Sequence, residues 1–309
     1  MIYTCTLNPS VDYLVQADQI KLGDLNRAQN VSFFPGGKGI NVSRVLRNLD
    51  IDSIALGFLG GFTGDFIRNE LNKEGISNDF IYVEEPTRIN VKLKTKEETE
   101  INGVGSYISE IKQEELLQKF QSFTSDDYVV LAGSLPASVS TQFYEALTNQ
   151  CSQNGSHLIV DTSGESLKNL LKYQPFLVKP NHHELGEILN RTLTSLDEVI
   201  ASGKELLRKG PQNIIVSMGG DGAVFINNSL TAVATVPKGE VVSTVGSGDS
   251  TVAGFLAEYV KSGDFLKAFQ YGVASGTATA FSNDLCNKSR VEEVLPKVKI
   301  ELLDKEMTS

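Results

Sequence analysis

The sequence predicts an α/β fold with a mostly parallel central sheet. Short apolar runs rich in β-branched residues alternate with longer segments of helical periodicity, which is the pattern of strand-helix-strand units. Two segments break this alternation, at residues 12–34 and 87–103, and both have the character of antiparallel strands. Since neither segment has room for a crossover helix, we expect them to form a small separate sheet.

The expected elements follow in order along the chain. The predicted buried strands lie at residues 2–7, 54–59, 128–132, 158–161, 176–179 and 214–217. One predicted helix carries an apolar stripe within residues 42–49, and a second carries another within residues 252–260. Gly263 stands where the second helix would be capped.

The length predicts one large domain over residues 1–309 with a small appendage, because single cores stop growing near this size. The appendage is the small sheet formed by residues 12–34 and 87–103. In open α/β folds ligands bind at the carboxyl ends of the parallel strands. We therefore expect the small sheet to project from the body as a lid over those ends.

The composition narrows the functional class. A formal net charge of −10 argues against a nucleic-acid or membrane partner held by a broad basic surface. The chain shows no signal-peptide pattern and no apolar run near the roughly 18 residues of a membrane span, so we expect a cytoplasmic protein. Cys5, Cys151 and Cys286 have no metal-ligand spacing, which predicts small buried hydrophobic residues rather than a zinc site.

A first candidate site lies at residues 244–250, before the predicted helix that begins near Asp249. Gly246 and Gly248 flank Ser247, and backbone N–H groups at such a helix start form an anion site. A carboxylate beside that site can accept a proton from an attacking hydroxyl. The alternative is that Asp249 only caps the helix.

A second candidate site is the glycine-rich turn at residues 34–44. Gly36 and Gly37 offer backbone donors without side-chain bulk, Lys38 offers a charge suited to phosphate, and Asn41 faces the turn one helical step later. A plain tight turn is the alternative. Neither a P-loop nor a dinucleotide-binding glycine motif is present in the sequence, so any nucleotide is held by another architecture.

A third candidate site follows the predicted strand that ends at Lys179. Asn181 and Glu184 are three residues apart, so both face one side of a first helical turn, where they can order water on Mg²⁺. A capping box explains the same spacing without a ligand. His182 and His183 have no third metal ligand in the sequence pattern, which favours a structural role for both.

Together these segments resemble the phosphofructokinase-B (ribokinase-like) carbohydrate kinases. Residues 36–41 and 245–250 are similar to the two signatures of that family, residues 181–184 to its NxxE motif, and residues 217–223 to its nucleotide loop. The resemblance runs from Met1 to about Ser282. It implies a three-layer αβα sandwich with a β-sheet lid, an ATP-dependent kinase activity, and Mg²⁺.

Four further segments, at residues 6–13, 60–64, 87–92 and 132–136, resemble the branch of the family that acts on sugar phosphates. Residues 23–27, together with residues 37–44 and 87–92, are most similar to the members of this branch that act on fructose 1-phosphate. This similarity implies fructose 1-phosphate as acceptor and fructose 1,6-bisphosphate as product. Tagatose 6-phosphate and fructose 6-phosphate are alternative acceptors. A non-catalytic sugar or nucleotide sensor is disfavoured by the presence of Asp249, and a nucleoside kinase by Lys38 together with Arg88.

The resemblance also implies roles for individual residues. Asp249 is the expected general base, assisted by the backbone amides of Gly246, Ser247 and Gly248. The expected sugar-phosphate site consists of Asp12, Arg27, Gly36, Gly37, Lys38, Asn41, Arg88, Asn90 and Ser134. The expected ATP site consists of Lys179, Asn181, Glu184, Ser217, Gly219, Gly220 and Gly222, with Asn181 and Glu184 organising Mg²⁺ through water.

The small sheet also carries an apolar pattern. Val31, Phe33, Val91 and Leu93 stand at alternating positions of two predicted strands, so they share faces of those strands. A small projecting sheet has no core of its own to bury such residues, and exposed apolar patches mark interaction sites. We expect a homodimer in which two such sheets pack about a two-fold axis.

Overall fold

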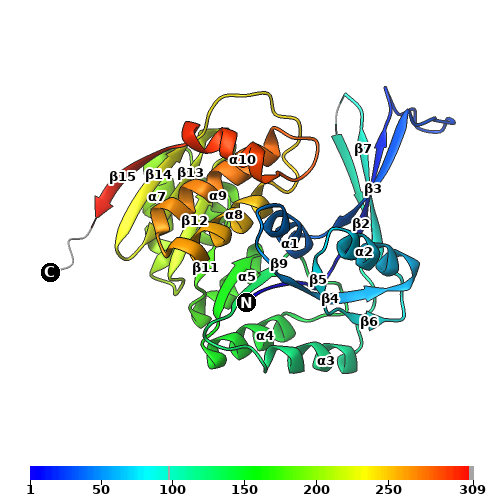
Figure 1. Ribbon diagram of the computed structural model, residues 1–309, viewed down its shortest axis with the longest axis horizontal. Coiled ribbons are helices and arrows are strands. Elements are labelled where there is room, and N and C mark those ends of the chain that lie inside the picture. Colours follow the sequence, from blue (N-terminus) through cyan, green and yellow to red (C-terminus); the bar gives the residue numbers. More distant parts are fainter. Residues whose placement is uncertain (97, 306–309) are drawn as a thin grey trace.

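A computed structural model describes residues 1–96 and 98–305 of the protein (Figure 1). Its main sheet has eleven strands. They are β1 (Ile2–Thr6), β4 (Ile54–Gly60), β5 (Ser77–Asn78), β6 (Ile81–Val83), β9 (Tyr128–Ala132), β10 (His157–Asp161), β11 (Leu177–Val178), β12 (Asn213–Ser217), β13 (Ala223–Asn227), β14 (Leu230–Thr235) and β15 (Lys299–Lys305). Their spatial order is β15-β14-β13-β12-β11-β10-β9-β1-β4-β5, and β6 also pairs with β4.

The parallel part of this sheet confirms the predicted strands. The pairs from β4 through β1, β9, β10 and β11 to β12 are all parallel, with boundaries within about two residues of those expected. Three more strands, β13, β14 and β15, extend the sheet in antiparallel pairs. These three strands are not among the predicted ones, because antiparallel neighbours need no crossover helix and so show no alternation of strands and helices in the sequence.

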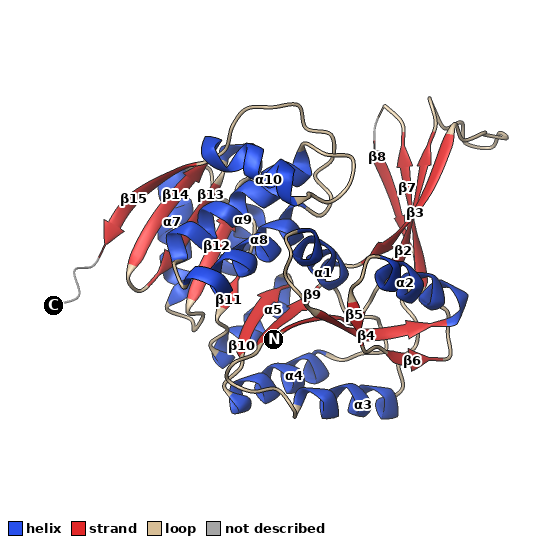
Figure 2. Ribbon diagram, in the orientation of Figure 1, coloured by secondary structure: helices blue, strands red, loops and turns tan. Residues whose placement is uncertain are grey.

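Helices cover both faces of the sheet (Figure 2). They are α1 (Lys38–Asn48), α2 (Gly61–Lys73), α3 (Glu110–Phe120), α4 (Thr141–Asn154), α5 (Gly164–Leu170), α6 (His182–Leu189), α7 (Leu196–Leu207), α8 (Ser247–Ser262), α9 (Phe265–Ala280) and α10 (Lys288–Val294). One core joins α1, α8, α9 and α10 to the sheet, and a second core joins α3 to α7 to the other face. The result is the expected three-layer sandwich.

The ends of the two predicted helices have clear causes. α8 ends at Gly263, whose φ of 65° is left-handed, so the expected glycine cap is confirmed. α1 begins after Gly37, which has no side chain to cap the helix; instead the backbone N–H of Ile40 donates to Thr6 Oγ1 at 3.0 Å. That bond ties the start of α1 to the end of β1.

The small sheet projects from the body beside α2 (Figure 1). It consists of β2 (Ser10–Gln16), β3 (Asn30–Gly36), β7 (Arg88–Lys94) and β8 (Glu98–Asn102), in the order β3-β2-β7-β8. The pairs within each segment are antiparallel as expected, but β2 and β7 pair in parallel. The long connection between β2 and β7 through the main sheet permits this parallel pairing, which alternation within one strand cannot reveal.

The apolar residues of the small sheet do share one face. Pairing sets Tyr13 opposite Phe33 and Val91, and it sets Val15 opposite Val31 and Leu93. The ring of Phe33 stacks on that of Tyr13, with centroids 4.6 Å apart, yet Phe33 is 52% exposed. The opposite face carries Asp12, Asn90 and Lys92, together with Leu14 and Phe34.

Two sequence expectations concern residues away from the sheets. Cys5, Cys151 and Cys286 are free and buried, as predicted. Within residues 1–96 and 98–305, no helix combines the length and the apolar character that crossing a membrane requires.

Candidate active site

The candidate residues gather where the parallel strands end. Asp161 is the last residue of β10, Lys179 directly follows β11, and Ser217 is the last residue of β12. α1 and α8 begin over the same edge and bring Lys38 and Asp249 to it. This is the position at which an open α/β sheet binds its ligands.

Asp249 lies in the first turn of α8 and is 5% exposed. The helix begins at Ser247 with Gly246 as its N-terminal cap, so Asp249 is not the cap residue. Its Oδ2 instead accepts a hydrogen bond of 2.8 Å from Asn41 Nδ2 on α1. Burial raises the pKa of Asp249 to about 6, and the charge of Asp161 acts in the same direction. A carboxylate with such a pKa is suited to general-base work near neutral pH.

The N-terminus of α8 is open towards this carboxylate. Gly246 has a φ of 76°, which favours glycine, and it provides no side-chain cap for the helix. The Ser247 N–H donates to the Thr244 carbonyl oxygen at 3.3 Å, whereas the amides of Gly248 and Asp249 have no intrahelical partner. A Cβ on Gly248 would lie 2.9 Å from Lys179 Nζ, so glycine lets that ammonium group approach the helix start. Unpaired N–H groups beside a cation form a site for an anion.

Two lysines and one aspartate complete a charged cluster around Asp249. Asp161 Oδ1 lies 3.2 Å from Lys38 Nζ and 3.6 Å from Lys179 Nζ. Burial acts to raise the pKa of Asp161, but the two lysine charges lower it below its ordinary value. The charge of Asp161 in turn raises the pKa of Lys38. Asp161 and Lys38 are therefore both charged near neutral pH.

The glycine turn before α1 meets the small sheet. A Cβ on Gly36 would lie 2.5 Å from Asp12 Oδ1, so glycine is needed for this approach. Asp12 Oδ1 accepts hydrogen bonds from Ser10 Oγ at 2.8 Å and from Asn90 Nδ2 at 3.3 Å. Asp12 Oδ2 forms an ion pair with Lys92 Nζ at 3.0 Å. Lys92 ends the segment at residues 87–92 that resembles the sugar-phosphate branch, but it is not among the site residues that the resemblance implies.

Arg88, one of the cations expected to hold the substrate phosphate, lies at the base of the small sheet. The Arg88 guanidinium donates to the carbonyl oxygens of Pro9, Asn8 and Gly103, at 3.3, 3.0 and 3.4 Å. Three of its five N–H groups are thus used at the base of the small sheet, and two remain. Ser134 is exposed, and its Oγ accepts from Asn8 Nδ2 at 3.2 Å.

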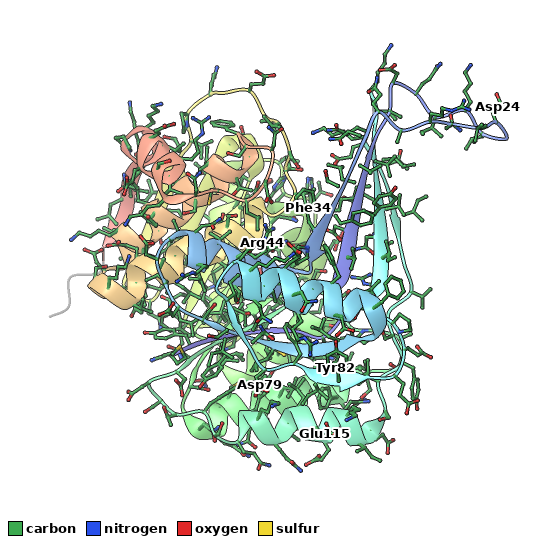
Figure 3. All side chains as sticks on the ribbon, turned by 45° about the vertical axis from the view of Figure 1, so that its right-hand side comes forward. Asp24, Phe34, Arg44, Asp79, Tyr82 and Glu115 are labelled. Carbon is green, nitrogen blue, oxygen red and sulfur yellow. The ribbon has the colours of Figure 1, made fainter. Side chains whose placement is uncertain are left out.

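Arg27 lies apart from this group within one subunit. It belongs to the loop between β2 and β3, which holds Asp24 at the outer tip of the small sheet (Figure 3), and its side chain is exposed. The loop lies beyond Gln16, four residues from Asp12, which is roughly 13 Å at about 3.3 Å per residue. The structure therefore does not bring Arg27 to Asp249 of the same chain.

The capping box expected as the alternative at the third site is present. Asn181 Oδ1 accepts from the Glu184 amide, and Glu184 Oε2 accepts from the Asn181 amide, both at 2.8 Å. Glu184 also contributes to raising the pKa of Lys38, so its charge faces the cluster around Asp249. The rings of His182 and His183 are in contact, with centroids 3.9 Å apart and planes tilted by 39°.

A pocket of about 510 Å³ opens on the other side of the α8 N-terminus. It contains the expected nucleotide residues Ser217, Gly219, Gly220 and Gly222, and also Ser247 and Gly248. Its remaining wall, which the sequence analysis missed, includes Pro237, Gly239, Val273, Gly276, Thr277, Ala280 and Phe281. The run of small residues in α9 was the available signal, because small side chains on a helix leave room for a ligand.

A second, narrower cleft of about 90 Å³ lies between the small sheet and the loop after α9. Its wall includes Asp12, Phe34 and Lys92 from the small sheet, Asn41 from α1, and Leu285 from the loop. Figure 3 shows Phe34 and Arg44 on the sides of the small sheet and α1 that face this region. Asp249 lies beside Gly248, which lines the wide pocket, and is hydrogen-bonded to Asn41, which lines the narrower cleft.

Comparison with known proteins identifies the family. Residues 6–290 match the model of the pfkB family carbohydrate kinases. The chain belongs to the pfkB family. The 1-phosphofructokinase of Bacillus subtilis is 49% identical over 97% of this chain and 99% of its own. The D-tagatose-1-phosphate kinase of Bacillus licheniformis is 38% identical over 97% and 99% of the two chains.

A solved pfkB-type structure has the same fold. Phosphofructokinase-2 from Escherichia coli, crystallised with fructose-6-phosphate, superimposes with a TM-score of 0.90 at 29% identity, over 96% of this chain and 98% of that one. The ribokinase-like α/β fold expected from the motifs is therefore confirmed, as is membership of a carbohydrate kinase family.

The charged cluster predicts the pH dependence of catalysis. We expect kcat/KM to fall as the pH drops through about 6, because protonated Asp249 cannot accept a proton. Asp161→Asn removes a negative charge that raises the pKa of Asp249, and it frees Lys38 and Lys179 to stabilise the carboxylate. The acid limb of the kcat/KM profile should therefore move to lower pH.

The substrates titrate identically with both enzymes, so the displacement between the two profiles isolates the enzyme group. Asp52→Asn, which alters an exposed ion pair on the surface, serves as control and should leave the acid limb in place. An acid limb that does not move in Asp161→Asn would contradict the electrostatic coupling.

Proposed function

We propose that the chain transfers the γ-phosphoryl group of ATP to the C6 hydroxyl of fructose 1-phosphate, which yields fructose 1,6-bisphosphate. The observation that carries this proposal is the buried Asp249 carboxylate beside the uncapped N-terminus of α8. Phosphoryl transfer needs positioning, a proton acceptor and donors for developing charge. All three meet at this point.

In this proposal Asp249 accepts the proton of the attacking hydroxyl, and Asn41 holds the carboxylate in the orientation that the bond of 2.8 Å defines. The amides of Gly246, Ser247 and Gly248 stabilise the charge that develops on the transferred group. Lys38 and Lys179 lie on the same side as these amides and neutralise phosphate oxygens, exchanging part of their contact with Asp161 for the ligand.

The two clefts suggest where the two substrates bind. The pocket of about 510 Å³ suits the nucleotide, because it joins the glycine-rich turn after β12 to the α8 N-terminus. The polar side, with Asp12, Asn41 and Asn90, suits a sugar, whose hydroxyls donate to carboxylate and amide oxygens. The small sheet then acts as a lid that excludes water from the phosphates.

The acceptor is proposed from the relatives. A 1-phosphofructokinase shares 49% of its residues with this chain, and a D-tagatose-1-phosphate kinase shares 38%. Fructose and tagatose differ in configuration at C4 alone, and both names place the existing phosphate at C1. We therefore favour fructose 1-phosphate, with tagatose 1-phosphate as the related acceptor, over sugars phosphorylated at C6.

The donor set fits a Mg²⁺ ion held mostly by phosphates and water. Within the part of the chain that the structure describes, no three acidic, histidine or cysteine side chains form a metal site of their own. Asp161 Oδ2 is nevertheless buried without a hydrogen-bond partner, and the Glu184 carboxylate faces the same cluster. Mg²⁺ commonly binds through one or two carboxylates plus substrate phosphates. It would supply charge neutralisation there.

Asp249→Asn tests the assignment of the base. We expect kcat to fall at least about 10²-fold, because the amide cannot accept the proton, while ATP binding is retained. The assay couples ADP release to fructose 1-phosphate, tagatose 1-phosphate, tagatose 6-phosphate and fructose 6-phosphate with the wild-type chain and with the variant.

Asp52→Asn, the same substitution at an exposed position on the surface, serves as control and should keep kcat within about twofold. A near-normal kcat in Asp249→Asn would contradict the assignment of Asp249 as the base. Faster turnover by the wild-type chain of a C6-phosphorylated sugar would overturn the acceptor. No turnover of any of the four sugars would favour a non-catalytic sensor.

Glu184→Gln tests whether this residue contributes to metal binding. If Glu184 orders Mg²⁺ through water, the variant should need a higher Mg²⁺ concentration for half-maximal rate. Glutamine preserves an acceptor for the Asn181 amide, so the capping box is retained. A lower melting temperature with an unchanged Mg²⁺ requirement would show that Glu184 serves the helix alone; Glu198→Gln, in the capping box of α7, is the matched control.

We also propose a homodimer formed through the apolar face of the small sheet. Tyr13, Val31, Phe33, Val91 and Leu93 lie on this face, and Phe33 continues towards Phe66 of α2, with ring centroids 6.3 Å apart. A second copy of the same face would cover these side chains in a two-fold contact.

We propose a cytoplasmic location as well, because buried free cysteines agree with the reducing conditions of that compartment.

Light scattering at micromolar concentration tests the dimer. We expect the wild-type chain to have the mass of a dimer, and the double variant Phe33→Asp with Leu93→Asp to have the mass of a monomer, because charges would be buried in the contact. Ile111→Asp on α3, which alters an exposed apolar residue away from the small sheet, should remain dimeric. A fully active wild-type monomer would refute the dimer, and a double variant that stays dimeric would place the interface elsewhere.

A further inference from the structure

Lys92 occupies an unusual place on the small sheet. It lies on β7, on the face that looks into the polar cleft, and its Nζ is 3.0 Å from Asp12 Oδ2 and 3.9 Å from Glu100 Oε1. The side chains of Lys92 and Asp12 are only 13% and 16% exposed. Ion pairs this sheltered from water are screened weakly, so the contact has more effect than a surface pair.

The contact completes the set of donors around Asp12. Ser10 Oγ and Asn90 Nδ2 both donate to Oδ1, and Lys92 holds Oδ2. Both oxygens are therefore fixed, and so is the plane of the carboxylate. Remaining lone pairs of a carboxylate fixed in this way can accept hydroxyl protons of a sugar in a defined direction.

The surroundings of Lys92 argue against a direct role in binding phosphate. Two carboxylates, those of Asp12 and Glu100, already neutralise its charge. Lys94 stands two residues further along the same face, opposite Glu98, and it is Lys92 that pairs with Asp12. A lysine that bound the phosphate of the substrate would have to leave Asp12 with an uncompensated charge in a sheltered position.

We propose that Lys92 is a positioning residue for the sugar: it fixes the Asp12 carboxylate, so that Asp12 accepts a hydroxyl proton of the acceptor in a defined direction. The inference rests on the proposed sugar-kinase function, in which Asp12 binds the acceptor. Without Lys92, Asp12 Oδ2 loses its donor, and the carboxylate is held through Oδ1 alone.

A double-mutant cycle between Lys92→Met and Asp12→Asn tests this role in the full-length chain. Methionine keeps the length of the side chain and removes its charge. Alone, Lys92→Met should lower kcat/KM for fructose 1-phosphate about tenfold, mainly through KM, with the KM for ATP unchanged. In the Asp12→Asn background the same substitution should cost less than about twofold, since the carboxylate that Lys92 serves is gone.

Lys94→Met is the matched control, because it removes the same charge from the same face of the small sheet. It should change kcat/KM less than about twofold. Lys92→Arg, which keeps the charge, should recover most of the loss. An equal loss in Lys92→Met and Lys94→Met would overturn the proposal in favour of a general electrostatic effect of the small sheet.

Unphosphorylated fructose, used at high concentration as a poor acceptor, distinguishes a positioning role of Lys92 from direct binding of the substrate phosphate. A positioning role predicts that Lys92→Met impairs fructose and fructose 1-phosphate by similar factors. Loss confined to fructose 1-phosphate, together with additive effects in the cycle, would mean that Lys92 binds the phosphate and would overturn the proposal. If the wild-type chain turns over none of the sugar phosphates, the proposed function itself fails, and calorimetric titration of fructose 1-phosphate into the same variants still reports whether Lys92 acts through Asp12.

Discussion

The active region depends on how a nearly buried carboxylate is kept charged. Taking an ion out of water is costly unless partners compensate it. Asp249 and Asp161 supply two negative charges, and Lys38 and Lys179 supply two positive charges, within contacts of 3.2 to 3.6 Å around Asp161. Because the cluster is balanced, no member can be removed without leaving a charge uncompensated. The same balance keeps the pKa of Asp249 at about 6, where the group remains a carboxylate at neutral pH and yet retains basicity.

The parallel sheet is what brings these four groups together. Asp161 ends β10 and Lys179 follows β11, and neighbouring parallel strands end at the same edge. Lys38 joins them because α1 begins against Thr6 at the end of β1, and α8 packs beside α1. The antiparallel strands β13 to β15 extend the sheet and add the turn after β12. The strand order therefore brings these side chains together at one edge of the sheet, because each of them lies at or next to the end of a strand or the start of a helix.

This explains which parts of the site local sequence could predict. Local sequence predicts the glycine-rich turns before α1 and α8, because a left-handed φ and a close approach of the backbone both require glycine at Gly37 and Gly246. Local sequence does not predict the pairing of Lys38 with Asp161, because only the strand order makes these two residues neighbours. Spacing also cannot separate two roles of one residue: Asn181 and Glu184 form a capping box, and Glu184 still faces the charged cluster. The antiparallel C-terminal strands were missed for the lack of crossover helices.

The pairing register of the small sheet determines both the face on which the sugar is proposed to bind and the apolar face opposite to it. Side chains alternate between the two faces of a strand, so Asp12 and Lys92 face the cleft while Tyr13 and Val91 face away. A shift of one residue in the pairing of β2 with β7 would exchange the two sets. The bonds from Asn90 and Lys92 to Asp12 oppose that shift from the polar side, and stacking of Tyr13 on Phe33 opposes it from the apolar side. In the proposed homodimer, covering the apolar face would strengthen the register that directs Asp12 towards the proposed sugar site, so assembly and substrate binding would be energetically coupled even though they use opposite faces.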